Sequence, residues 1–328
     1  MFSVTKFELR KNRNFVFYIY CVGKVTVPDY FFSEFFLDLK IKEIGREKVG
    51  IFSLLKLRNS ISNEYCLVFC EKSNLLKLLL NLNAHIVPFL VDQSIDLSVG
   101  KKGVYDNYHK HLKSKEFRKL KRFRYTCEVK NKADGLKKIY EKMYLPIMKE
   151  RLKIKAEKFS DFKKYFKDSY LLVSQNKIAV GFVSLMKENK LLIMRRLGVL
   201  DASKELYSKS IMIALYYFLV EYALKSKFAF LSLGYSAPSL NNGVLIYKNK
   251  WGAKISHNDE IFTFYFGVGK INKQISEIFY GKPLICMKED RLGALVFGGK
   301  GNKFFIKKIN KMIDISFFQG IDFLLRFN

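Results

Sequence analysis

The sequence predicts an α/β protein, and three observations support this. Segments rich in aromatic and β-branched residues alternate with segments whose apolar residues recur at helical spacing. Residues 170–198 have the pattern of three strands joined by two short polar turns. A polar loop, a long apolar helix at 211–226 and a further strand at 228–234 follow them. This order predicts a sheet covered by helices.

The first hundred residues are predicted to form a smaller α/β domain. Its predicted strands are 15–22, 49–57, 64–70 and 85–91, and its predicted helices are 31–44 and 75–82. Pro88 interrupts the last strand, which favours a position at the edge of a sheet. This region, 1–100, contains no motif that indicates chemistry.

A strongly basic segment follows. Residues 101–167 hold 23 basic and 8 acidic residues, so their net charge is +15. In the predicted helix 113–123, Phe117, Leu120 and Phe123 share one face, and Lys and Arg cover the rest. Such a helix is either a solvated face or a site for phosphates. Pro146 predicts a kink in the next helix, 133–152.

The whole chain carries 59 basic and 30 acidic residues among 328, a net charge of +29. This charge indicates an anionic partner such as nucleic acid, anionic lipid, a polyanionic glycan or a phosphorylated cofactor. A bias of composition toward Lys, Asn, Ile and Phe explains part of the same excess. The partner therefore has to be identified from a site.

Cysteine usage and hydropathy predict the compartment. The five cysteines have no metal-binding spacing, which favours a reducing cytoplasm over a disulfide framework. The first residues lack the apolar run of a signal peptide, and the most apolar run, 211–220, is too short to span a bilayer. We expect a cytoplasmic protein, with a peripheral position at the inner face of the membrane as a second expectation.

The polar loop before the long helix is a candidate phosphate site. The N–H groups of a helix N-terminus have no partner within the helix, and the helix dipole is positive there. Ser208, Lys209 and Ser210 offer two hydroxyls and an ammonium at this position. The alternative interpretation is that Ser208 caps a core helix.

The segment 233–255, LGYSAPSLNNGVLIYKNKWGAKI, resembles the C-terminal motif of GNAT acyltransferases, in particular the FemAB-like branch found beside envelope polysaccharide genes. The matching residues are Gly234, Asn242, Gly243, Tyr247, Lys248, Trp251 and Gly252. Asn242 stands where the branch usually has Asp. The resemblance covers roughly 105–266.

The resemblance implies three regions. A GNAT-like domain with a mixed sheet flanked by helices would occupy 101–268, with strand 260–268 as a further member of its sheet. A degenerate GNAT-like α/β domain would precede it at 1–100, and a C-terminal extension would follow at 269–328. In that extension, 304–318 has apolar and basic residues at helical spacing, which suits packing on the core or binding to a membrane surface.

The GNAT resemblance also implies a reaction. Strands Leu191–Leu197 and Phe228–Leu233 would splay apart, and the pantetheine arm of acetyl-CoA or another acyl-CoA would lie between them. The acyl group would pass to an amine, such as an amino sugar of a surface polysaccharide, without a metal. The glycine-rich phosphate loop of the superfamily is absent here. Its place is taken by Leu206, Tyr207, Ser208, Lys209 and Ser210.

Site residues follow from the same resemblance. Tyr247 would protonate the leaving thiolate, and its alternative role is that of a core ring. Asp201 and Glu205 are the candidate bases. Substrate or phosphate contacts are expected from Arg195, Arg196, Asn242 and Lys248. Strand alternation predicts that Arg195 and Arg196 point to opposite faces.

Two other functions remain open at this stage. A Fem-type aminoacyl-tRNA-dependent transferase is favoured by the charge of +29. A non-enzymatic scaffold that keeps the GNAT-like fold is favoured by the missing glycine-rich loop. The basic segment 101–167 would bind tRNA or an anionic membrane surface.

Overall fold

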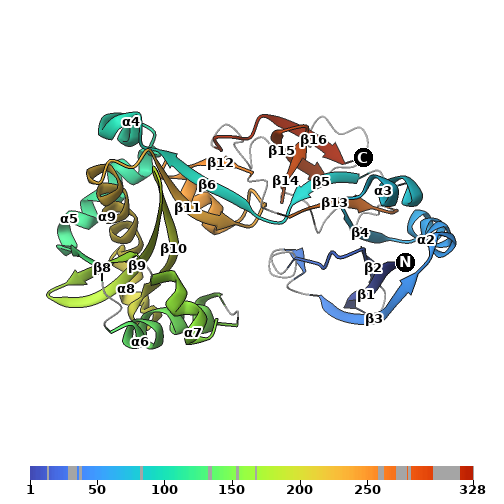
Figure 1. Cartoon of the computed structure of the whole chain (residues 1–328), viewed down its shortest axis with the longest axis horizontal. Coiled ribbons are helices and arrows are strands. Elements are labelled where there is room, and N and C mark those ends of the chain that lie inside the picture. Colours follow the sequence, from blue (N-terminus) through green and yellow to red (C-terminus); the bar gives the residue numbers. More distant parts are fainter. Residues whose placement is uncertain are drawn as a thin grey trace. The chain divides into compact units, whose positions relative to one another are not determined.

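The computed structural model of the chain forms two compact units (Figure 1). The first unit contains Met1–Val91, Tyr235–Ile246 and Ile255–Asn328, and the second contains Asp92–Gly234 and Tyr247–Lys254. The structure describes residues 1–12, 15–28, 35–36, 39–81, 84–131, 135–152, 155–166, 168–257, 262–270, 279, 282–297 and 318–327.

A nine-stranded mixed sheet with the order β16-β15-β14-β5-β13-β4-β2-β1-β3 dominates the first unit. Its elements are β1 (Phe2–Asn12), β2 (Phe15–Val22), β3 (Lys40–Val49), α2 (Ile51–Asn63), β4 (Cys66–Glu71), α3 (Asn74–Leu80), β5 (Ala84–Pro88), β13 (Thr263–Val268), β14 (Leu284–Lys288), β15 (Arg291–Phe297) and β16 (Phe323–Phe327). Buried aromatic rings hold its centre: Phe69 of β4 lies 5.5 Å from Phe264 and 5.3 Å from Phe266 between ring centroids.

The packing of Phe264 and Phe266 of β13 on Phe69 of β4 places β13 in the first unit, so the boundaries of the two units differ from the predicted domain boundaries. Strand β13 was expected in the GNAT-like domain, but it pairs with β4 and β5 of the first unit. Strands β14, β15 and β16 of the predicted extension 269–328 extend the same sheet. The predicted helix 304–318 lies outside the described residues, except for Phe318.

Local predictions in the first hundred residues succeeded in part. Strands 15–22 and 64–70 and helix 75–82 are confirmed as β2, β4 and α3. The strand predicted at 49–57 is wrong, because helix α2 places Leu54 and Ile61, two turns apart, on one buried face. The helix predicted at 31–44 is wrong over its second half, which pairs with β1 as strand β3. Residues 29–34, 37 and 38 are not described.

A seven-stranded mixed sheet with the order β12-β6-β11-β10-β9-β8-β7 dominates the second unit. Its strands are β6 (Val91–Asp96), β7 (Thr126–Lys130), β8 (Ser169–Gln175), β9 (Ile178–Glu188), β10 (Leu191–Val199), β11 (Phe230–Ser236) and β12 (Lys254–Ser256). The predicted antiparallel meander is confirmed, because β8 pairs with β9 and β9 with β10.

Helices accompany this sheet and confirm the α/β class. They are α4 (Gly100–Asp106), η1 (Leu112–Glu116), α5 (Phe117–Phe123), α6 (Leu136–Ile139), η2 (Tyr140–Tyr144), η3 (Ile147–Leu152), α7 (Phe159–Phe162), η4 (Lys163–Phe166), η5 (Leu200–Ala202), α8 (Lys204–Ser208), α9 (Ile211–Lys225) and α10 (Gly243–Asn249). Pro146 lies between the π-helical segments η2 and η3, so the predicted irregularity is present.

Helix α9 and Trp251 organise the core of the second unit. Eight side chains of α9 are buried, and the Trp251 ring stacks 5.6 Å from Tyr216 of that helix. Trp251 also contacts Tyr108 and Phe117, at centroid distances of 5.3 and 6.0 Å. Within the part of the chain that the structure describes, no helix is both long and apolar enough to cross a membrane.

Candidate functional site

Strands β10 and β11 pair over a short stretch and then diverge. Their parallel pairing joins Leu191 to Phe230, Leu192 to Leu231 and Ile193 to Ser232. Strand β10 continues to Val199 and β11 to Ser236, both beyond the last pair. The pairing of the two strands thus ends at Ile193 and Ser232, as the predicted splay requires.

A β-bulge on β10 lies directly beyond the last pair. The register with β9 shifts between Met194 and Arg196, so Arg195 is the extra residue. The Arg196 N–H donates to Ser184 Oγ at 2.9 Å, and the Ser184 hydroxyl donates to the Arg196 carbonyl oxygen at 3.3 Å. Bulges turn side chains away from the regular alternation of a strand. Here the bulge gives the two neighbouring arginines different surroundings.

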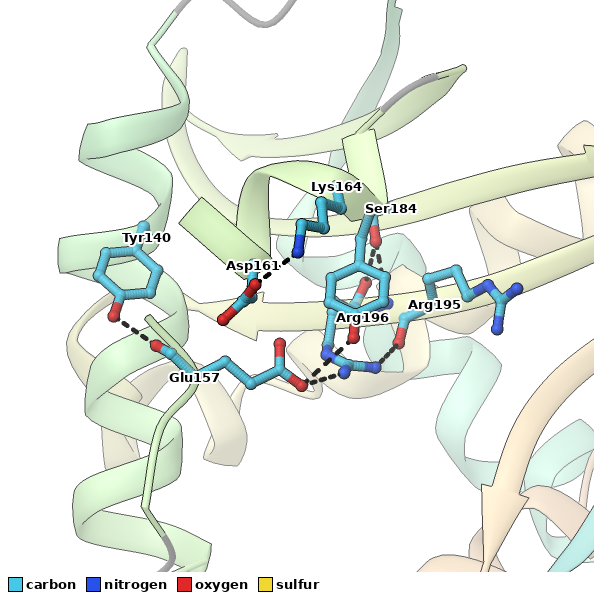
Figure 2. A network of polar contacts seen from close by, with 8 residues as sticks. Tyr140, Glu157, Asp161, Lys164, Ser184, Arg195 and Arg196 are labelled. Carbon is cyan, nitrogen blue, oxygen red and sulfur yellow. Dashed lines mark hydrogen bonds and ion pairs between the residues drawn. The ribbon is translucent and has the colours of Figure 1, made fainter. Parts of the chain in front are cut away.

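Arg196 forms an ion pair with Glu157, a residue of the segment before α7 (Figure 2). Its guanidinium also lies 3.9 Å from the ring centroid of Tyr165. The Tyr140 hydroxyl donates to the Glu157 carbonyl oxygen at 2.6 Å and fixes the backbone of this segment. Glu157 Oε2 is buried and accepts no hydrogen bond from the residues that the structure describes. One carboxylate oxygen is thus held by Arg196, and the other is buried without a hydrogen-bond partner among the described residues.

Arg195 extends away from Glu157, as Figure 2 shows. Its Nη2 lies 3.1 Å from Met186 Sδ on β9. The expected opposite orientation of the two arginines is present. Arg196, at 26% side-chain exposure, is the one whose charge is paired inside the fold.

Lys248 of α10 places a buried ammonium beside the divergence. Its side chain is 3% exposed, and its Nζ donates to the Gly234 carbonyl oxygen at 2.7 Å. Burial lowers the pKa of Lys248 to about 7, and the Asp92 carboxylate opposes that shift. Gly234 has φ +72°, and a Cβ there would lie 3.2 Å from the Met194 carbonyl oxygen. The backbones of β10 and β11 are therefore still close where Lys248 binds.

A short chain of hydrogen bonds surrounds this ammonium. Ser232, the last paired residue of β11, donates its hydroxyl to Asp92 Oδ1 at 2.8 Å. The Gly234 N–H donates to Ser232 Oγ at 3.1 Å. These bonds fix the β11 backbone around the carbonyl that Lys248 contacts.

The predicted phosphate loop has a different structure. Residues 204–208 form the one-turn helix α8, whose N-cap is Ser203, because its side chain accepts from the Leu206 N–H at 3.3 Å. The next N–H groups bind carbonyl oxygens: Tyr207 to Ser203 (3.1 Å), Lys209 to Glu205 (3.0 Å) and Ser210 to Tyr207 (3.0 Å). The hydroxyl of Ser208 donates to the Glu205 carbonyl oxygen at 2.7 Å. These groups are engaged within the chain and do not form an open phosphate cradle.

The N-terminus of α9 already has an anion beside it. Its N-cap, Ser210, is buried and donates its hydroxyl to Glu116 Oε2 at 3.2 Å. Lys209 forms an ion pair with Glu205, and the Arg151 guanidinium lies 3.6 Å from the ring centroid of Tyr207. A carboxylate near a helix N-terminus takes the favourable place of a phosphate. The loop as folded therefore does not fit the pyrophosphate of CoA.

The remaining predicted residues have other surroundings. Tyr247 packs on Tyr216 at 5.0 Å between ring centroids, and burial raises the pKa of its hydroxyl well above the ordinary value. Glu205 is exposed, and the hydrogen bond from Lys209 lowers the pKa of its carboxyl. Asp201 is also exposed, at φ +49°.

Asn242, a residue of the first unit, precedes helix α10, whose residues 243–246 belong to the first unit and 247–249 to the second. Its Oδ1 accepts from the Leu245 N–H at 2.9 Å, which is the contact of an N-cap. Aspartate, the usual residue of the FemAB-like branch, is an equally good cap, so the difference between the two sequences leaves this role intact. The structure assigns Asn242 to the helix start and not to the group around Lys248.

The site therefore combines predicted and unpredicted residues. The structure brings Arg195, Arg196 and Lys248 to the divergence of β10 and β11. Sequence reasoning missed Asp92, Glu157, Ser184 and Ser232. Glu157 had one visible signal: it is the single acid among four basic residues between 151 and 158. No group of three or more His, Cys, Asp or Glu side chains within the described ranges is arranged to hold a metal ion.

Comparison with known proteins gives distant structural likenesses. No protein-family model matches the sequence, and no curated protein matches it. FemX is 14% identical over 82% of this chain and 85% of that chain, with a TM-score of 0.43. L-PGS from Bacillus licheniformis is 14% identical, with 70% and 74% covered and a TM-score of 0.36.

A tandem GNAT protein from the clavulanic acid biosynthesis pathway is similar at 11% identity. The match covers 78% of this chain and 76% of that chain, with a TM-score of 0.31. Because all three scores lie below 0.5, the reactions and substrates of those proteins do not carry over to this chain.

Proposed function

We propose that the chain is an N-acyltransferase that moves an acyl group to an amine where β10 and β11 diverge. The observation that carries the proposal is the parallel pairing of these strands over three residues, which ends beside a bulge of β10 against β9. Diverging strands leave N–H and C=O groups on their inner edges, and an extended acyl donor can pair with such groups as an added strand does.

Lys248 supplies positive charge in this site. A buried ammonium is worth more to a developing negative charge than an exposed one, because little water screens it. Its bond to the Gly234 carbonyl oxygen fixes it next to the last paired residues of the two strands. We assign Lys248 to the acyl carbonyl oxygen, which becomes negative when the amine adds to the carbonyl carbon.

Glu157 is the proposed proton acceptor. The amine nitrogen forms a bond to the acyl carbon, the bond to the leaving group breaks, and the leaving group departs with the electron pair of that bond. We assign the proton lost from nitrogen to the Glu157 carboxylate, whose buried Oε2 accepts no other bond among the described residues. Arg196 positions the carboxylate through the other oxygen.

The donor is either an acyl-CoA thioester or an aminoacyl-tRNA ester. The closed loop at 206–210 and the carboxylate of Glu116 weaken the case for a pyrophosphate at the start of α9. The exposed cations of α5, among them Arg118, Lys121 and Arg122, suit the repeating phosphates of RNA. These observations support aminoacyl-tRNA as the alternative donor to acyl-CoA.

Transfer of a labelled acyl group tests the proposal. The full chain is incubated with an amino sugar and, in separate reactions, with ¹⁴C-acetyl-CoA or with charged ¹⁴C-aminoacyl-tRNA, and the labelled amide is measured. Lys248→Met is expected to lower kcat/KM by roughly 100- to 1,000-fold, as loss of an oxyanion donor does. Met keeps most of the volume, so the fold is retained.

Lys6→Met in the first unit is the matched control. Like Lys248, Lys6 has a partner within the fold, in this case the Glu64 carboxylate at 3.1 Å, but Lys6 lies outside the proposed site. Its variant is expected to keep the wild-type rate. If neither donor gives an amide across a panel of primary amines, the transferase proposal fails. Equal rates for wild type and Lys248→Met would remove Lys248 from the reaction.

A further inference from the structure

A groove that the acyl-transfer proposal does not use lies between α6, the β8–β9 hairpin and the edge strand β7 of the second unit. Its volume is about 790 Å³, within the usual range of small-molecule sites. It opens at the margin of the core cluster that contains Phe162, Phe166 and Phe182. The groove therefore borders the interior of the unit, and its lining residues Ile139 and Met143 are buried.

The floor and walls of the groove are apolar. They include Ile139, Met143, Leu172, Ile178 and Leu200. Ile178 is 62% exposed, although it begins a strand whose next buried residue is Val180. Large apolar side chains grouped in an open groove mark a surface that a ligand covers.

Four lysines surround this apolar surface: Lys130, Lys138, Lys142 and Lys177. Lys130 is paired with Glu128 at 3.0 Å, the acidic residue of the lining. The structure gives no ion pair to the other three within its described ranges. Lys138 and Lys142 are four residues apart on one helical face, a spacing at which like charges repel. An anion between them would relieve that repulsion.

Lys177, the third of these lysines, lies in the two-residue turn of the β8–β9 hairpin. Asn176 and Lys177 both have positive φ, +50° and +65°, as the central residues of a tight two-residue turn do. Glycine is the usual second residue of such a turn, so a lysine here adopts an unfavourable backbone conformation. The turn nevertheless presents an ammonium beside the exposed Ile178.

We infer that this groove binds an anionic amphiphile, with an aliphatic chain on the apolar floor and an acidic head group among Lys138, Lys142 and Lys177. The combination excludes simpler ligands. A polyanion would satisfy the lysines and leave the apolar floor in water, whereas a neutral hydrocarbon would leave the three cations without a counter-ion. This inference does not rest on acyl transfer.

Direct binding of defined amphiphiles tests the inference. Dodecyl phosphate, dodecylphosphocholine and ethyl phosphate are titrated into the full chain by calorimetry, each below its micelle concentration. Dodecyl phosphate is expected to bind at least about tenfold more tightly than either of the others, because it alone has both the chain and the net charge. Equal affinity for ethyl phosphate, or for dodecylphosphocholine, would overturn the proposal.

Variants locate the binding. Ile178→Asp and the double variant Lys138→Glu/Lys142→Glu are each expected to weaken dodecyl phosphate binding by about tenfold or more. All three side chains lie at the surface, so circular dichroism should confirm that the variants fold. The matched controls lie on β3 of the first unit: Ile44→Asp, at an exposed isoleucine, and Lys40→Glu/Lys42→Glu. If the controls weaken binding equally, the effect is one of net charge and the groove is not the site.

Sedimentation with vesicles then identifies the source of the amphiphile. Vesicles of phosphatidylglycerol are compared with vesicles of phosphatidylcholine. If the groove variants lose binding to phosphatidylglycerol vesicles that wild type retains, the ligand is a membrane lipid. If wild type binds monomeric dodecyl phosphate but neither vesicle, the ligand is a free amphiphile. Both results support the groove, and a wild type that binds none of these probes refutes it.

Discussion

The two units of the chain use their interiors differently. The first buries aromatic rings and four of the five cysteines, Cys21, Cys66, Cys70 and Cys286. Burial raises the pKa of each of these thiols to about 12, so they remain protonated and unreactive. The second unit buries an ammonium, Lys248, and a carboxylate oxygen of Glu157.

Two lysines, one in each unit, illustrate this difference in what the units bury. Lys6 in the first unit is 27% exposed, pairs with Glu64 and lies over the rings of Tyr18 and Tyr20. Lys248 is 3% exposed, and the partner that its ammonium contacts at 2.7 Å is a backbone carbonyl oxygen. Burying an ammonium costs desolvation free energy, whereas a partly exposed ion pair is nearly neutral in free energy. Strongly shifted pKa values gather at functional sites, and for this reason the proposed acyl transfer is assigned to the second unit.

The largest expected effect is on the pH dependence of stability. The pKa of Lys248 falls from 10.5 to about 7 on folding, so between these values the unfolded chain binds one more proton than the folded chain. By linkage, stability must then rise with pH across that window, by roughly 5 kcal/mol in all. Urea unfolding of wild type and Lys248→Met at pH 7 to 10.5 measures it. The wild type should gain stability relative to the variant, and parallel curves would mean that Lys248 is not a buried cation.

The next largest expected effect is on kcat, and it distinguishes two paired carboxylates. Glu157 pairs with Arg196 in the second unit, and Glu64 pairs with Lys6 in the first. Glu157→Gln is expected to lower kcat by about 100-fold or more with little change in KM, as loss of a base does. Glu64→Gln should leave kcat unchanged. A Glu157→Gln enzyme with normal kcat but a lower melting temperature would make Glu157 a structural residue.

A smaller effect concerns the distribution of charge. Arg118→Glu/Lys121→Glu/Arg122→Glu on α5 is expected to weaken tRNA binding and to reduce the slope of log K against log salt by about 2 to 3. Lys40→Glu/Lys42→Glu/Lys48→Glu on β3 makes the same change of charge in the first unit and should leave that slope nearly unaltered. All six side chains are exposed, so melting temperatures should stay close to wild type. Equal effects of the two triple variants would show that net charge alone attracts RNA.

The smallest expected effect is on the free energy of unfolding, and it distinguishes two tyrosines. The Tyr20 hydroxyl donates to Glu64 Oε2 at 2.6 Å, whereas the buried Tyr247 hydroxyl has no partner in hydrogen-bond geometry among the described residues. Tyr20→Phe should lower the free energy of unfolding by about 1.5–3 kcal/mol, and Tyr247→Phe should leave it unchanged or raise it slightly. Thermal unfolding measures both. A large fall in kcat for Tyr247→Phe would restore its predicted role as a proton donor.

Prediction from the sequence succeeded where the signal was local. The turns at 176–177 and 189–190 and the burial of α9 follow from turn residues and apolar runs within a few positions. The strand predicted at 49–57 is wrong because a short run of apolar residues fits both the two-residue period of a strand and the 3.6-residue period of a helix. The structure forms a helix here, which buries Leu54 and Ile61 on one face.

The site was harder to predict because its contacts span long distances in the chain. Glu157 meets Arg196 across 39 residues, and Ser232 meets Asp92 across 140. The bulge that follows Met194 depends on the register with β9, which the sequence of β10 does not reveal. Lys248 was named because a motif marked it. Its burial and its bond to Gly234 needed the structure.

The interleaved path of the chain bears on how the protein is made. The second unit lacks Trp251 and the rest of 247–254 until the chain has passed through the segment Tyr235–Ile246, which belongs to the first unit. The nine-stranded sheet in turn joins β1, at residues 2–12, to strands as late in the chain as β16, at residues 323–327. At about 5–20 residues per second, β1 waits tens of seconds on the ribosome for its sheet to be completed. Nascent-chain chaperones are thus expected to shield the apolar strands made first until β16 has been synthesised.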